Sequence, residues 1–150
     1  MLFRSNMNDK TILLVEDNSD DQVLVMRAFK KSNFMDKVVV VRDGAAALDY
    51  LFARDPGEMP GVVLLDLKLP KVNGLEVLRR LRANERTQFL PVVMLTSSDE
   101  ERDINDSYDL GINSYICKPV DFTRFAEAVR RLGVYWLALN VAPPQKKRVR

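Results

Sequence analysis

The sequence contains no histidine and only one cysteine, Cys117. Without histidine, the chain cannot use a Ser-His or Cys-His pair for nucleophilic catalysis, and it cannot itself carry a phosphohistidine. A single cysteine excludes an internal disulfide and is typical of a reducing compartment; within an apolar run, it is expected to be inert core. Any chemistry must therefore use carboxylates, hydroxyls, lysines or a bound metal ion.

Long apolar runs and a strong charge imbalance are also missing. No stretch approaches the roughly 20 apolar residues that a helix needs to span a bilayer. Residues Met1–Lys10 lack an apolar stretch followed by a small-residue cleavage site, so secretion is not expected. The net charge of +2 is too small to indicate nucleic acid as the main partner. We therefore expect a cytoplasmic protein with neither a membrane nor a nucleic-acid partner.

The sequence does contain a regular alternation of short apolar runs and longer amphipathic stretches. The expected strands are Thr11–Val15, Val38–Val41, Val62–Leu67, Pro91–Leu95 and Asn113–Cys117. The expected helices are Asp20–Lys31, Ala45–Phe52, one containing Leu75–Leu81, one opened by Ser97–Glu101, and a long one over Pro119–Asn140 that Pro143-Pro144 would end. Apolar strands without polar alternation are typical of parallel strands covered on both faces.

This alternation predicts an α/β fold with a doubly wound five-stranded parallel sheet in the order 2-1-3-4-5 and an extended C-terminal helix. We expect one domain over residues 10–140. A flexible N-terminus at residues 1–9 and a disordered basic tail at residues 141–150 would flank it.

Polar side chains follow the apolar runs at four of the expected strand ends. They are Glu16-Asp17 after the first strand, Asp66 at the end of the third, Thr96-Ser97 at the end of the fourth and Lys118 at the end of the fifth. In an open parallel sheet, ligands bind beyond the carboxyl ends of the strands, near the point where the strand order reverses. That point lies between the first and third strands, so the sequence predicts one shallow pocket that gathers these groups.

Three carboxylates in one pocket repel each other. Two carboxylates about 4 Å apart repel by roughly 4 kcal/mol at an effective dielectric constant of 20. Lys118 offsets part of this cost, and a hard divalent cation can offset the rest; oxygen ligands in an open pocket favour Mg²⁺. Such a cation supports phosphoryl transfer, for which Asp66 at the centre of the sheet is the natural nucleophile.

Several motifs together resemble the receiver domains of two-component response regulators over roughly residues 10–132. These motifs are Glu16-Asp17, Asp66 followed by Pro70 and Asn73-Gly74-Leu75-Glu76, Thr96-Ser97, and Gly111 followed by Tyr115-Ile116-Cys117-Lys118-Pro119. The resemblance implies a flavodoxin-like receiver fold. It also implies a phosphoacceptor signalling domain rather than an enzyme, with only self-catalysed phosphotransfer and autodephosphorylation as its chemistry.

The same resemblance implies a role for each acidic residue of the pocket. Asp66 would accept a phosphoryl group from a histidine kinase. Asp17 and Asp66 would ligate Mg²⁺, with the backbone carbonyl of Lys68 as a third protein ligand. Glu16 would act mainly through water.

The resemblance further implies how a phosphoryl group would be sensed. Thr96 would hydrogen-bond one phosphoryl oxygen and Lys118 would pair with another, while the small Ser97 leaves room for the group. Tyr115 would swing between outward and inward rotamers, and the bond between Lys118 and Pro119 is expected to be cis. Because phosphorylation adds about −1.5 to −2 charges, we expect a shape change that reaches the fourth helix, fifth strand and fifth helix.

The region beyond residue 132 extends the last helix with aromatic and apolar side chains. We predict that Tyr135, Trp136 and Leu137 form a homodimer patch; the alternative is that this helix end folds back over its own domain. The helix end and the loop around Pro56–Gly61 resemble single-domain regulators that partner bacterial and cyanobacterial phytochromes. This implies a sensor histidine kinase, with a phytochrome as one candidate. With about ten residues after the last helix, we expect output through docking, on that kinase, on a downstream phosphotransfer protein or on a second copy.

Three other functions share this predicted topology. A flavin or nucleotide site needs a Gly- or Ser/Thr-rich loop after the first strand, where the acidic run of residues 16–21 would repel a phosphate. A phosphatase of the haloacid-dehalogenase type typically has a second aspartate two residues after its nucleophile, where this chain has Lys68. A receiver-shaped module that is never phosphorylated stays open, although Asp66, Thr96 and Lys118 argue against it.

Overall fold

Five parallel strands form one sheet in the part of the chain that the structure, a computed structural model, describes: residues 10–31, 37–118 and 121–144. The strands are β1 (Ile12–Val15), β2 (Val38–Val41), β3 (Val62–Leu65), β4 (Val92–Thr96) and β5 (Ser114–Cys117). Their order is β2-β1-β3-β4-β5, and every pairing is parallel. The predicted fold class and strand order are confirmed.

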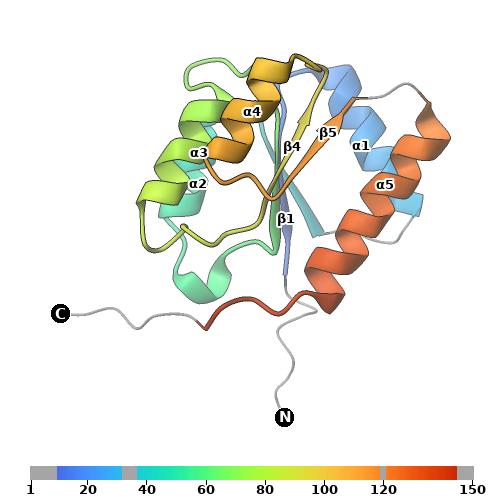
Figure 1. The fold of residues 1–150 in the computed structure, drawn as a ribbon. Coiled ribbons are helices and arrows are strands. Elements are labelled where there is room, and N and C mark those ends of the chain that lie inside the picture. The colour runs from blue at the N-terminus through green and yellow to red at the C-terminus, as the bar shows by residue number, and fades with distance from the viewer. Residues whose placement is uncertain (1–9, 32–36, 119–120, 145–150) are drawn as a thin grey trace, which may run out of the picture.

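Helices cover both faces of this sheet. They are α1 (Ser19–Lys31), α2 (Gly44–Phe52), α3 (Gly74–Ala83), α4 (Glu101–Asp109) and α5 (Phe122–Val134). In Figure 1, α1 and α5 lie on one face of the sheet, and α2, α3 and α4 lie on the other. No helix within the described residues has the length and apolar character that crossing a bilayer requires.

Successive residues of the central strands point into two separate cores. Leu13 and Val15 of β1 belong to the core under α2 and α3, whereas Ile12 and Leu14 belong to the core under α1 and α5. All four are at most 1% exposed. The absence of polar alternation in these strands therefore has a direct cause, because both faces of each strand are buried.

Polar side chains cap the starts of α2 and α3 and so fix where the loops after β2 and β3 end and these helices begin. Asp43 accepts a hydrogen bond from the Ala46 amide at 2.7 Å at the start of α2, and Asn73 accepts one from the Glu76 amide at 3.0 Å at the start of α3. Each cap satisfies an amide that has no partner within its helix. These caps place the loops after β2 and β3 at the carboxyl edge of the sheet.

Two helix starts differ from the prediction. The fourth helix begins at Glu101 rather than at Ser97, because residues 97–100 form a loop held by side-chain hydrogen bonds. The last helix begins at Phe122, where Asp121 in extended conformation accepts a hydrogen bond from the Thr123 amide. The predicted cis bond before Pro119 and the N-terminus at residues 1–9 lie outside the described residues. Of the predicted tail at residues 141–150, only residues 141–144 are described; they are exposed and belong to no helix or strand.

Two glycines bring the loop after β3 close to its neighbours. A Cβ at Gly44 would lie 1.8 Å from the carbonyl oxygen of Val72, and a Cβ at Gly74 would lie 2.3 Å from that of Asp66. Both contacts are far shorter than any real Cβ contact, so only glycine allows this approach. The Gly74 amide also donates to the Leu67 carbonyl at 2.8 Å. The loop that follows Asp66 is therefore fixed between α2 and α3.

The chain beyond α5 continues as a π-helical turn, Tyr135–Leu139, which packs partly onto its own domain. Leu137 is 3% exposed and belongs to the core under α1 and α5; Trp136 packs against the same core. Gly61 leaves room for this packing, since a Cβ there would lie 2.8 Å from Leu137 Cδ2. The prediction that Leu137 lies in an exposed dimer patch is wrong, and the alternative, a helix end folded back over its own domain, describes it.

Candidate functional site

The carboxyl edge of the sheet gathers three acidic side chains. Glu16 and Asp17 follow β1, and Asp66 follows β3. One carboxylate oxygen from each of the three lies within 4.8 Å of the others. Asp17 is half-buried and more accessible than the other two, whereas Glu16 and Asp66 are buried. The structure therefore brings together the three carboxylates predicted as metal ligands, with an open side at Asp17 from which an ion can enter.

Lys118, which follows β5, is the cation at the centre of this group. Its Nζ forms an ion pair with Glu16, and it lies 3.1 Å from Asp66 Oδ2 and 3.0 Å from Asp21 Oδ2. Only 4% of the Lys118 side chain is exposed. Asp21 was not predicted as a site residue, because acidic residues in the first turn of a helix are common. Asp21 lies in the first turn of α1, and its contact with Lys118 depends on where that helix lies over the sheet.

Glu16 is the most buried of the three acids, at 1% exposed. Burial raises the pKa of Glu16 to about 7, the charge of Asp66 raises it too, and the hydrogen bond from Lys118 opposes both effects. The Asn18 amide donates to its carboxylate at 3.2 Å. Burial by itself lowers the pKa of Lys118, but the hydrogen bond to Glu16 and the charge of Asp66 raise it above its ordinary value. One lysine thus only partly compensates the buried negative charge.

Thr96, Ser97 and Tyr115 lie on the β4–β5 side of the site. Thr96 is 1% exposed at the end of β4, and Ser97 next to it is exposed. The Tyr115 hydroxyl donates to the Ser98 carbonyl at 2.9 Å, so the half-buried ring is held against the loop after β4. Cys117 at the end of β5 is exposed, and the prediction that it is inert core is wrong because β5 is an edge strand.

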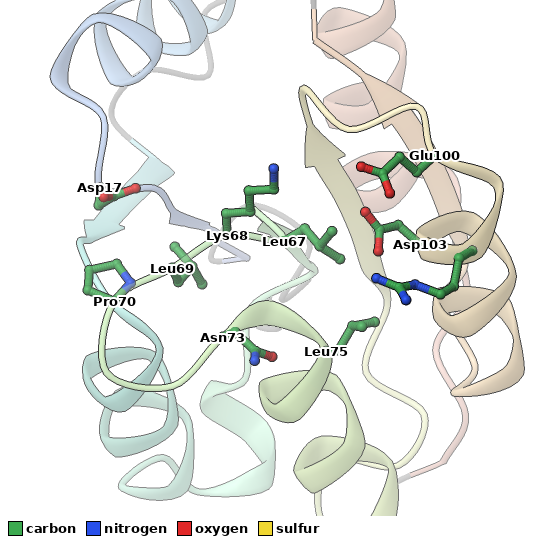
Figure 2. A pocket seen from close by; sticks show the side chains of 10 residues that line it. Asp17, Leu67, Lys68, Leu69, Pro70, Asn73, Leu75, Glu100 and Asp103 are labelled. Atoms are coloured by element: carbon green, nitrogen blue, oxygen red, sulfur yellow. The ribbon is translucent and has the colours of Figure 1, made fainter.

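A cavity of about 640 Å³ opens beside the acidic group. Its lining residues follow β1 and β3 or lie at the starts of α3 and α4: Asp17, Leu67, Lys68, Leu69, Pro70, Asn73, Leu75, Glu100, Arg102 and Asp103. Figure 2 shows Glu100 and Asp103 on the α4 side, across from Lys68 and Leu67. Asp17 belongs both to this cavity and to the acidic group, so a donor molecule in the cavity would lie next to the carboxylates.

Fold and site together define the class of this protein: a doubly wound α/β domain with an acidic pocket and a buried lysine at the carboxyl edge of its sheet. The family model of the response regulator receiver domain matches residues 12–130, and the chain therefore belongs to that family. This confirms the resemblance seen in the sequence. A flavin-binding domain and a phosphatase of the haloacid-dehalogenase type are no longer competing interpretations.

Individual relatives agree with this assignment. The chain is 44% identical over 134 residues to the probable methanogenesis regulatory protein FilR2 of Methanothrix harundinacea, covering 88% of this chain and 86% of the relative. It is 36% identical over 137 residues to response regulator Rcp1 of Synechocystis, covering 89% and 93%. The crystal structure of Mn²⁺-bound Rcp1 matches with a TM-score of 0.77 at 35% identity, covering 90% of this chain and 99% of that one. The crystal structure of the phosphorylated cyanobacterial phytochrome response regulator RcpA matches with a TM-score of 0.79 at 38% identity, with the same coverage.

Proposed function

We propose that this receiver domain accepts a phosphoryl group on Asp66 and signals by changing shape. The observation that carries the proposal is the position of the Asp66 carboxylate, 3.1 Å from the Lys118 ammonium and grouped with Glu16 and Asp17. Lys118 would balance part of the charge that a phosphoryl group adds to Asp66. The cavity beside Asp17 gives a donor its way in.

The residues of the acidic group fit Mg²⁺. All three are carboxylates, the ligand type that hard cations prefer, and Lys118 alone leaves the negative charge only partly compensated. We infer that Asp17, Asp66 and the Lys68 carbonyl hold the ion directly and that Glu16 acts through water. When bound, Mg²⁺ would neutralise charge that develops on the transferring phosphoryl group. The Mn²⁺-bound structure of Rcp1 supports an ion at this kind of site.

The reaction itself needs little from the protein beyond positioning. An Asp66 oxygen attacks phosphorus, the bond between phosphorus and the donor nitrogen or oxygen breaks, and the donor leaves with the electron pair. The product is an acyl phosphate on Asp66. Thr96 and Lys118 then donate hydrogen bonds to phosphoryl oxygens, which biases Tyr115 and the surface formed by α4, β5 and α5.

The partner we propose is a sensor histidine kinase. A phytochrome is the favoured candidate, because this chain is similar to RcpA, a cyanobacterial phytochrome response regulator. A downstream phosphotransfer protein can take the phosphoryl group further. A cytoplasmic location agrees with the free thiol of Cys117.

Acetyl phosphate tests the proposed function directly. Incubation with acetyl phosphate and Mg²⁺ should add one phosphoryl group, measured by intact mass, and Asp66→Asn should abolish the gain. Asp99→Asn is the matched control, because Asp99 is an exposed carboxylate that should leave the gain unchanged. Omitting Mg²⁺ in the presence of a chelator should also abolish it. A wild-type protein that gains no mass, or an Asp66→Asn variant that still gains it, contradicts the proposal.

We also propose that the exposed side of the C-terminal turn mediates homodimer formation. Tyr135 and Leu139 are 47% and 65% exposed and lie one turn apart. The variant Tyr135→Ser/Leu139→Ser should shift the protein toward the monomer in size-exclusion chromatography with light scattering, because it removes apolar surface from the contact. Phe89→Ser, which removes an aromatic that is 61% exposed elsewhere on the surface, should leave the mass unchanged. A wild-type monomer at all concentrations would refute the dimer.

A further inference from the structure

Ser98, in the loop between β4 and α4, connects three parts of the site. Its amide donates to Thr96 Oγ1 at 3.4 Å, its hydroxyl donates to Asp103 Oδ2 at 2.6 Å, and its carbonyl accepts from the Tyr115 hydroxyl at 2.9 Å. Ser98 itself is 7% exposed. One residue thus contacts the end of β4, the first turn of α4 and the tyrosine of β5.

The contact with Thr96 matters for the direction of its hydroxyl. Across residues 10–31, 37–118 and 121–144, the Thr96 hydroxyl accepts the Ser98 amide and donates no hydrogen bond. A hydroxyl has one proton, so this arrangement keeps the Thr96 proton available for an incoming phosphoryl oxygen. The position of the Ser98 amide therefore determines the direction in which the Thr96 hydroxyl can donate its proton.

Asp103 is what holds Ser98 in place. Hydrogen bonds to an ionised carboxylate are roughly twice as strong as neutral ones, and this one joins the loop to the start of α4. Helix α4 has few other anchors, since Ser107 is its only buried residue. Loss of the bond between Ser98 and Asp103 would leave the loop tied to α4 mainly through the backbone.

We propose that Ser98 is a positioning residue for phosphoryl acceptance and that the bond to Asp103 fixes it so that Thr96 and Tyr115 are both held for the reaction. This inference rests on the proposed function of Asp66 and names two residues that control it. The Ser98 hydroxyl bonds to Asp103 and accepts from the Glu100 amide, so in this proposal its effect on the reaction passes through Thr96 and Tyr115.

A double-mutant cycle tests the bond. Ser98→Ala and Asp103→Ala should each slow phosphorylation by acetyl phosphate about tenfold, measured as an intact-mass time course, and the double variant should be no slower than either one. Ser98→Thr and Asp103→Asn keep a donor and an acceptor, so they should react within about twofold of the wild type. In a Tyr115→Phe background, which removes one of the two groups that Ser98 positions, Ser98→Ala should have a smaller effect.

Ser107→Ala separates positioning from general loosening of α4. The Ser107 hydroxyl donates to the Asp103 carbonyl at 2.8 Å, so this variant removes another bond of the same helix turn without touching the loop. It should leave the phosphorylation rate unchanged. An unaltered rate in Ser98→Ala, additive effects in the double variant, or an equal loss in Ser107→Ala overturns the inference.

Amide hydrogen exchange in the absence of a phosphodonor keeps the two proposals distinguishable. Exchange across residues 97–103 should accelerate in Ser98→Ala and in Asp103→Ala, but not in Ser98→Thr. If the wild-type protein is not phosphorylated, the proposed function fails. Unchanged exchange in Ser98→Ala overturns the inference about Ser98 whatever the phosphorylation result.

Discussion

Lys118→Met is expected to lower the free energy of unfolding of the metal-free protein by about 3–5 kcal/mol at pH 8, because breaking a buried ion pair leaves its partner charge uncompensated. Lys118 is the cation that faces Glu16, Asp66 and Asp21, and Glu16 is 1% exposed. Urea denaturation measures the loss. Mg²⁺ should restore part of it, since a divalent cation can replace the missing positive charge among the carboxylates.

The loss should also depend on pH in a defined direction. Burial already raises the pKa of Glu16 from its ordinary value of 4.5 to about 7 in the folded protein, and removal of Lys118 raises it further. A carboxyl group with a raised folded pKa stabilises the fold fully below its unfolded pKa, and this stabilisation is lost as pH rises through the folded pKa. The variant should therefore be closer to wild type at pH 5 than at pH 8.

Lys68→Met is the matched control for this experiment. Lys68 is exposed beside the same cavity and forms no ion pair among the described residues. Its replacement should change the free energy of unfolding by less than about 0.5 kcal/mol. Equal losses for the two lysines, or a Lys118→Met loss that is the same at both pH values, would show that the buried charge is compensated in another way.

Gly44→Ala is expected to destabilise the fold by about 3 kcal/mol or more, at or above the upper end of what overpacking usually costs. The new Cβ would lie 1.8 Å from the Val72 carbonyl oxygen and 2.7 Å from its carbon, and a backbone carbonyl cannot move aside as a flexible side chain can. Either α2 or the loop after β3 must shift. Thermal or urea denaturation gives the change in stability.

The shift should also reach the site, because Lys68 and Asp66 lie at the start of that loop. We expect Gly44→Ala to weaken stabilisation by Mg²⁺ even where the variant still folds. Gly57→Ala is the control, since Gly57 lies in the exposed turn Pro56–Glu58. If Gly44→Ala is as stable as Gly57→Ala, the loop after β3 accommodates the extra methyl group and the prediction is wrong.

Local patterns predicted most of the fold and the acidic group. The apolar runs of β1 and β3 carry no polar alternation, so their burial on both faces follows from composition, and parallel strands place Glu16, Asp17 and Asp66 at one edge. The ends of the elements were harder to predict. The sequence pattern predicts a helix start at Ser97. In the structure, hydrogen bonds of the Ser98 hydroxyl hold residues 97–100 in a loop, and α4 begins after them.

Contacts between residues distant in the sequence could not be predicted in this way. Asp21 meets Lys118 across 97 residues, and that contact depends on how α1 sits over the sheet. Leu137 belongs to the core only because Gly61 leaves space at the start of β3. An exposed apolar helix end and a buried one have the same composition, so only packing distinguishes them.

The sequence by itself determined the succession of strands and helices and the identity of the carboxylates and lysine at the strand ends, because apolar periodicity depends on residues close in the chain. The strand order followed from the doubly wound fold class that this succession predicts. The tertiary structure alone decided that Asp21 joins the site, that Leu137 is core and that Ser98 links Thr96, Asp103 and Tyr115. Those outcomes depend on the relative positions of elements, which are set by the packing of side chains that no local pattern encodes.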